Sequence, residues 1–214
     1  MKRKQFGLIF LVVGAVTMLV MSAHYYTTSY SGILSGKAIA SWGWYRVCFY
    51  THITMGLVAI VIGSIQFVGR MLRRYKQIHR RIGYLYTGAV ALSACTGLVV
   101  AQYAMGGVVT RVGFSVLAVL WGSTLFIAMR AALKGRILAH RRWMTLNYAL
   151  TFSAVTQRTI LLFAFLPGLE FMPVYQSSSW LSWSINLTIA LLIIKSKTSD
   201  TPIIPLADTG HGRL

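Results

Sequence analysis

Residues 47–68 read VCFYTHITMGLVAIVIGSIQFV, a stretch of 22 residues that contains no Asp, Glu, Lys or Arg. As an α-helix it is about 33 Å long at ~1.5 Å per residue, enough to cross the hydrocarbon core of a bilayer, which is about 30 Å thick. The stretch therefore predicts a transmembrane helix. Five further apolar stretches predict spans of the same kind, namely Phe6–Ala23, Tyr84–Met105, Phe114–Leu133, Trp143–Phe165 and Leu181–Ile194.

The composition agrees with a membrane protein. The chain has 214 residues, of which 56% are hydrophobic and 11% are charged, whereas a soluble domain carries roughly 25% charged residues. It contains 21 Lys and Arg but only 3 Asp and Glu, for a formal net charge of +18. A nucleic-acid-binding domain spreads such charge over a polar surface, but here apolar runs separate it into clusters. We therefore expect an all-α integral membrane bundle and no nucleic-acid partner.

Six spans occupy most of the chain and leave no room for a separate soluble domain. We expect one transmembrane domain at 1–197, with its core at 47–165, and a polar, disordered tail at 198–214. Cys48 and Cys95 fall at different depths of their predicted spans, so the sequence predicts no disulfide between them.

The positions of the basic residues predict the orientation. Seventeen of the 21 lie in the loops and tails at one end of the spans, three lie at the other end, and Arg158 lies within the fifth span. Basic loops stay in the cytoplasm, which predicts a multi-pass protein of the bacterial cytoplasmic (inner) membrane with both termini inside. The inner clusters would also attract anionic lipid at the cytoplasmic face, by about 1 kcal/mol per residue.

Polar residues inside membranes are costly and often functional. Those in the predicted spans are His52, Gln66, Gln102, Asn147, Gln157, Arg158 and Asn186. In the fifth span, His140, Asn147, Thr151 and Arg158 share one helical face, because they are separated by multiples of 3.6 residues to within one position. This face indicates either hydrogen bonding between helices or a surface for a ligand or cofactor.

Arg158 needs a counter-charge. An arginine at mid-membrane costs about 2.5–3.5 kcal/mol on insertion scales, and the acids of the chain, Glu170, Asp200 and Asp208, all lie outside the spans. The guanidinium could snorkel outward to Glu170. Otherwise a bound anion would satisfy it, such as a haem propionate, a lipid phosphate or an organic acid.

Four histidines are candidate ligands for haem iron. His24 and His52 form a predicted outer pair, and His79 and His140 form a predicted inner pair. Two pairs at opposite depths are what two membrane haems would need. Small residues at Gly56, Ala59 and Gly63 on the His52 face would let a flat ring or another helix approach. Gln66 stands where two-haem helices often carry their second histidine, so the pattern is incomplete.

A weak internal repeat links two of the spans. His79-Arg80-Arg81 opens the third span, and His140-Arg141-Arg142 opens the fifth. Tyr86, Ser93 and Ala94 follow the first motif, and Tyr148, Ser153 and Ala154 follow the second. The repeat suggests two related helical hairpins around one core.

Several motifs together resemble one family. They are HITMG at 52–56, QF at 66–67, HRRIGYLY at 79–86, GG at 106–107, GF at 113–114, Trp121, AHRRWM at 139–144, YALTF at 148–152, AVT at 154–156, Arg158, WLSW at 180–183 and NL at 186–187. Over about residues 47–190 the chain is similar to the bacterial membrane family called domain of unknown function 2306. The resemblance implies a polytopic inner-membrane protein but no agreed activity. The chain departs from it at Gln157, where leucine is expected, and after Asn186-Leu187, where relatives often carry an acid.

Three functional classes remain open. The leading hypothesis is a haem b or quinone-linked redox protein that uses His52 with His24, His79 or His140, assisted by Gln66, Asn147 and Arg158. The second is a binding or transport protein for an anionic or lipid-like ligand centred on Arg158. The third is a membrane assembly factor without a substrate. The sequence contains no nucleophile–base–acid arrangement, phosphate loop or metalloprotease motif, so we do not expect a hydrolase.

Overall fold

The computed structural model describes residues 2–27, 38–66 and 75–199, and these residues are almost entirely helical. The elements in chain order are α1 (Lys2–Thr27), the short 3-10 helix η2 (Ala38–Ser41), α2 (Gly43–Gln66), α4 (Lys76–Ala101), α5 (Gly107–Leu133), α6 (Ile137–Leu161), η3 (Leu162–Phe165) and α7 (Phe171–Ser199). No strand occurs in these three ranges, so the predicted all-α class is confirmed.

Five of the helices are long and apolar enough to cross a membrane, and α1 contributes a shorter apolar segment, Leu11–Ala23. The protein is thus a multi-pass membrane protein, as its composition predicts. The helices extend beyond several predicted spans, because polar and aromatic residues at the membrane surface continue a helix without contributing to an apolar run.

Two predicted boundaries are wrong. The predicted third span reaches Met105, but α4 ends at Ala101, and the connection to α5 runs through Gly106 and Gly107 at φ of 82° and 72°. That left-handed backbone suits glycine and stops the helix. The last helix begins ten residues before the predicted Leu181, at Phe171. Pro173 does not interrupt it, because a first helical turn needs no backbone N–H.

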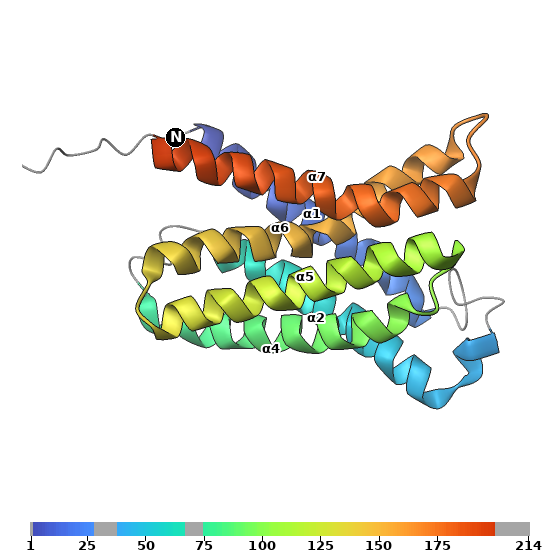
Figure 1. Cartoon of the computed structure of the whole chain (residues 1–214), viewed down its shortest axis with the longest axis horizontal. Helices are drawn as coiled ribbons and strands as arrows, with labels where there is room; N and C mark the ends of the chain where they lie inside the picture. Colours follow the sequence, from blue (N-terminus) through green and yellow to red (C-terminus); the bar gives the residue numbers. More distant parts are fainter. Residues whose placement is uncertain (1, 28–37, 67–74, 200–214) are drawn as a thin grey trace, which may run out of the picture.

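Four helices form the centre of the molecule. Helix α2 packs on α4, α4 on α5, α5 on α6, and α6 closes the ring against α2. Helices α4 and α6 therefore lie at opposite corners. Figure 1 shows α7 crossing one side of this bundle, where it packs mainly on α6, with α1 behind it against α2 and α6.

In the core, aromatic side chains pack against small residues of neighbouring helices. Gly63 of α2 is buried, and a Cβ added there would overlap the ring of Tyr148 on α6. The Tyr148 hydroxyl lies 2.6 Å from Ser64 Oγ and donates to the backbone oxygen of Ile60 at 3.0 Å. The small-residue face of α2 thus receives a neighbouring helix and its tyrosine.

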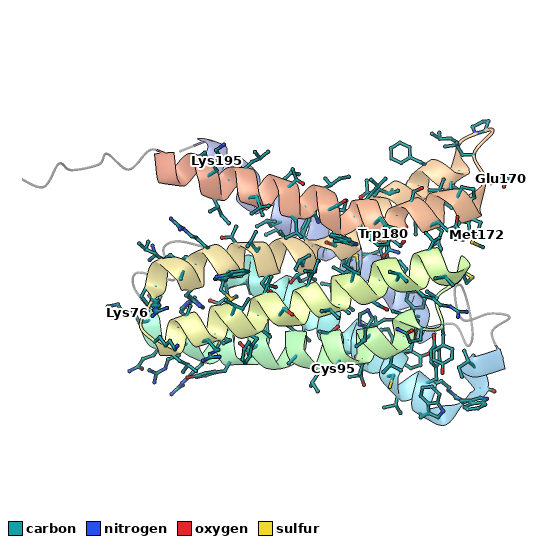
Figure 2. The ribbon with its side chains drawn as sticks, in the orientation of Figure 1. Lys76, Cys95, Glu170, Met172, Trp180 and Lys195 are labelled. Atoms are coloured by element: carbon teal, nitrogen blue, oxygen red, sulfur yellow. The ribbon has the colours of Figure 1, made fainter. Side chains whose placement is uncertain are left out.

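The two ends of the bundle differ in charge. Figure 2 shows Lys76 and Lys195 at one end, which we call the inner end, and Glu170 and Met172 at the opposite, outer end. The start of α1 and the end of α7 lie together at the inner end (Figure 1). Placing this end in the cytoplasm remains a prediction from the basic residues.

Candidate functional site

The weak repeat in the sequence corresponds to three layers along the bundle axis. Helices α4 and α6 both begin at the inner end, and the backbone N–H of His79 and that of His140 make equivalent first-turn bonds, to Tyr75 O at 3.0 Å and Arg136 O at 2.9 Å. Positions at the same offset from these two histidines therefore lie at the same depth. Successive layers follow at intervals of seven residues, about 10 Å of helix.

The inner layer contains His79, His140 and Gln66. His79 and His140 lie in the first turns of α4 and α6, within electrostatic range of each other, and their pairing as haem ligands stays a prediction. His140 Nδ1 is 2.9 Å from the backbone oxygen of Ala128, and Gln66 Nε2 donates to the backbone oxygen of His79 at 3.2 Å. Gln66 Oε1 and His79 Nδ1 are buried without a partner among the described residues. Gln66 therefore links α2 to the start of α4 by a hydrogen bond.

The middle layer is a closed hydrogen-bond network centred on Asn147, which is 0% exposed. Tyr86 Oη donates to Asn147 Oδ1 at 2.7 Å and lies 2.9 Å from Thr151 Oγ1. Asn147 Nδ2 donates to Trp121 O at 2.8 Å and to Thr124 Oγ1 at 2.9 Å. Both donor hydrogens and the oxygen of this amide are engaged, so the layer joins α4, α5 and α6 and leaves no donor of Asn147 for a ligand.

The outer layer holds His52 on α2 against α4. His52 Nδ1 lies 2.8 Å from Ser93 O and 3.2 Å from Ser93 Oγ, while Ser93 Oγ donates to His52 O at 2.8 Å. A Cβ at Gly97 would lie 2.7 Å from Nδ1, so a glycine is needed where the ring packs on α4. Nε2 of His52 makes no hydrogen bond to any residue that the structure describes.

Arg158 occupies the same layer on α6. Its Nη1 donates to the backbone oxygen of Ala154, on its own helix, at 3.1 Å. Ala154 stands at the same offset from His140 as Ser93 does from His79, so two equivalent carbonyls hold Arg158 and His52. Arg158 lies within electrostatic range of His52 on α2, of Tyr25 on α1 and of Tyr175 on α7.

The alternative in which Arg158 reaches Glu170 is not seen. No ion pair joins the two in the described chain, where Glu170 is exposed in the turn before α7. Arg158 is only partly exposed, and no acid lies in any of the spanning helices described. Within the described residues, Arg158 thus forms no ion pair with a carboxylate.

Two other polar residues predicted in the spans, Asn186 and Gln102, have structural partners. Asn186 accepts from Thr156 Oγ1 at 3.0 Å and donates to Ala149 O at 3.2 Å, which fastens α7 to α6. Gln102 Nε2 donates to Ser115 Oγ at 2.9 Å at the turn between α4 and α5. Gln157 lies partly exposed beside Arg158 on α6.

Three of the four candidate haem ligands, His52, His79 and His140, have described side chains. The side chain of His24 lies outside the described residues, so the predicted outer pair of His24 and His52 has no geometry here. No group of three or more His, Cys, Asp or Glu side chains in the described ranges is placed to hold a metal ion. Cys48 and Cys95 are free thiols, as predicted. In Figure 2, Cys95 points away from the bundle.

Tyr86, Ser93 and Trp121 were not predicted as partners of the polar face. Tyrosine, serine and tryptophan are ordinary residues in a membrane helix, and their partners lie 30 to 65 residues away in the chain. The seven-residue spacing after each HRR motif was the available signal. Counted from His79 on α4 and from His140 on α6, Tyr86 and Asn147 both stand seven residues on, and Ser93 and Ala154 both stand fourteen residues on.

Comparison with known proteins identifies a family. No curated protein and no solved structure matches the sequence. A family model described as "Predicted membrane protein (DUF2306)" matches residues 49–194, which is most of the chain and includes all three layers. The chain therefore belongs to this family of predicted membrane proteins, as its motifs indicate.

Proposed function

We propose that the protein binds an anionic, partly apolar small molecule in the outer layer, between Arg158 and His52. The main support for this proposal is that Arg158 has no acidic partner among the described residues. Inside a membrane-spanning helix, its hydrogen bond goes to the carbonyl of Ala154 and to no acid of the described chain. An intramembrane cation of this kind is a ligand-site hypothesis by default.

The surroundings suit such a ligand. A peptide carbonyl offers a partial charge, whereas an anion would form charge-assisted hydrogen bonds to the free edge of the guanidinium. Tyr25 of α1 and Tyr175 of α7 bring aromatic rings within electrostatic range of the cation. A headgroup held by Arg158 and an apolar tail along these rings would satisfy both features.

The test is thermal unfolding of the detergent-purified protein. Octanoate should raise the midpoint in a saturable way, because a ligand that binds the folded state stabilises it, and uncharged octanol should not. Arg158→Gln should abolish the octanoate effect. Arg130→Gln is the matched control, since Arg130 lies 5.6 Å over the Phe126 ring at the inner end of α5. Equal octanoate stabilisation in wild type and Arg158→Gln would remove the proposal.

A redox function with haem b or a quinone is the second candidate. It is favoured by His52 and His140, each of which holds Nδ1 against a backbone oxygen. Histidines that bind metal through Nε2 usually have this arrangement. The absorption spectrum after haem-replete expression tests it. A Soret band that disappears in His52→Ala would support His52 as an axial ligand, and the absence of any band would remove the haem hypothesis.

We further propose that this chemistry is located in a bacterial inner membrane with both termini in the cytoplasm, which would put the His52 layer in the outer half of the bilayer. A single cysteine in the turn at Gly135, in a Cys48→Ser and Cys95→Ser background, tests the orientation. Labelling of intact cells by a membrane-impermeant maleimide should fail, and labelling of inverted vesicles should succeed. The opposite pattern would reverse the assignment.

A further inference from the structure

The hydrogen bonds around His52 determine which of its nitrogens carries the proton. Ser93 O is a carbonyl and can only accept, so the ring nitrogen that faces it at 2.8 Å must be the donor. The single hydrogen of the Ser93 hydroxyl is used on His52 O at 2.8 Å. That hydroxyl therefore also acts as an acceptor toward Nδ1. The proton of the neutral ring is thus on Nδ1, and Nε2 carries a lone pair.

The outer layer consequently presents two groups of opposite hydrogen-bonding character. Arg158 has only N–H donors, whereas Nε2 of His52 is an acceptor without a partner among the described residues. At pH 7.5, above the ordinary histidine pKa of about 6.5, the neutral ring predominates and Nε2 keeps its lone pair.

We infer that the ligand is an anion that carries its own O–H group, with the anionic oxygens on Arg158 and the hydroxyl hydrogen donated to His52 Nε2. A hydroxy acid is the simplest such ligand. An anion without a hydroxyl would satisfy Arg158 but leave the acceptor Nε2 facing acceptor oxygens, and so would lack one hydrogen bond that a hydroxy acid makes. This inference rests on the proposed anion site and specifies what that site selects.

Two probes of equal charge and chain length test the selection. At pH 7.5, 2-hydroxyoctanoate and octanoate are both monoanions and differ in one hydroxyl group. We expect 2-hydroxyoctanoate to bind about tenfold more tightly, the effect of one well-placed hydrogen bond, as measured by the concentration that gives half-maximal thermal stabilisation. Lactate and propionate form the same pair without the long chain, and they separate a water-soluble hydroxy acid from a lipid-like one. A preference for the hydroxyl at either length supports the inference.

Two variants separate the acceptor from the ring's structural contact. His52→Asn keeps an N–H near the position of Nδ1, and so the bond to Ser93 O, but removes Nε2. We expect it to bind both probes equally. His52→Gln places an amide oxygen near the position of Nε2 and should retain most of the preference. His140→Asn is the matched control, since His140 Nδ1 also faces a backbone oxygen, that of Ala128, and its preference should equal that of wild type.

The outcomes distinguish this inference from the proposed function. If both probes stabilise the protein equally through Arg158, the anion site stands and the role of His52 as acceptor is overturned. The same holds if His52→Asn keeps the preference. If neither octanoate nor 2-hydroxyoctanoate stabilises the wild type, the anion site fails, and the inference fails with it.

Discussion

The middle and outer layers of the bundle contain similar polar groups but differ in how fully these are paired. In the middle layer, Asn147 uses both donor hydrogens and its oxygen, on groups from α4 and α5. In the outer layer, His52 and Arg158 each use one nitrogen to donate a hydrogen bond to a backbone oxygen. Both layers lie in helices long and apolar enough to span a bilayer.

This difference indicates different roles for the two layers. A buried polar group with every hydrogen bond made contributes to stability and to a unique packing, whereas one with unused groups costs free energy. A protein retains such a cost chiefly where function needs it. Stability measurements on single variants can therefore test whether the two layers have different roles.

The largest effect is expected for Asn147→Leu in the middle layer. The change removes three bonds, to Tyr86, Trp121 O and Thr124. It leaves the Tyr86 hydroxyl with Thr151 alone and Trp121 O with Thr124 alone. We expect a loss of about 2–4 kcal/mol in the free energy of unfolding, measured by denaturant titration in detergent micelles. A loss smaller than that of one ordinary hydrogen bond, about 1 kcal/mol, would mean that the network is not what holds α4, α5 and α6 together.

Gly63→Ala should have the next largest effect, because its new Cβ would overlap the ring of Tyr148. Overpacking of this kind costs about 1–3 kcal/mol. The control is Gly88→Ala on α4, where nothing lies within 4 Å; alanine is the better helix former, so that variant should be neutral or slightly stabilised. Equal behaviour of the two variants would contradict the tight contact between α2 and α6.

Ser93→Ala should be milder. It removes the hydroxyl bond to His52 O but keeps the Ser93 carbonyl that orients Nδ1. We expect a loss of about 1 kcal/mol and an unchanged preference for 2-hydroxyoctanoate over octanoate. Loss of that preference would show that the hydroxyl, rather than the carbonyl, sets the orientation of the ring.

Arg158→Gln should have the smallest effect on stability without ligand, and its sign should be neutral or favourable. The variant removes a charge from the membrane and gives up one bond to a carbonyl of its own helix. We expect the free energy of unfolding to stay within about 0.5 kcal/mol or to rise. A loss as large as that expected for Asn147→Leu would assign Arg158 a structural role and place the outer layer in the same class as the middle one.

The sequence was a good guide to the polar face of α6 and a poor guide to what that face contacts. The spacing of Asn147, Thr151 and Arg158 predicted one shared face, and the first two do bond across helices. The structural interpretation of that face is confirmed for Asn147 and Thr151, whereas Arg158 has donors without a partner among the described residues and its ligand stays a proposal. The partner residue Tyr86 could not be predicted, because its role depends on α4 facing α6 across the bundle.

The membrane location, the all-helical class and the positions of most spans could be predicted from the sequence alone. Hydropathy and charge are summed over neighbouring residues, so they can be read locally. Helix ends needed the structure, since the glycine turn after Ala101 and the early start at Phe171 depend on backbone conformation rather than on apolar content.

Which polar side chains form hydrogen bonds could be seen only in the tertiary structure. Whether a buried hydrogen-bonding group is satisfied depends on atoms of other helices, here from residues 41 to 84 positions away in the case of His52 with Ser93 and Ser64 with Tyr148. A hydrogen bond requires a fit of a few tenths of an ångström, which no spacing along one helix can specify. That fit is what separates the closed network at Asn147 from the nitrogens of His52 and Arg158 that have no partner among the described residues.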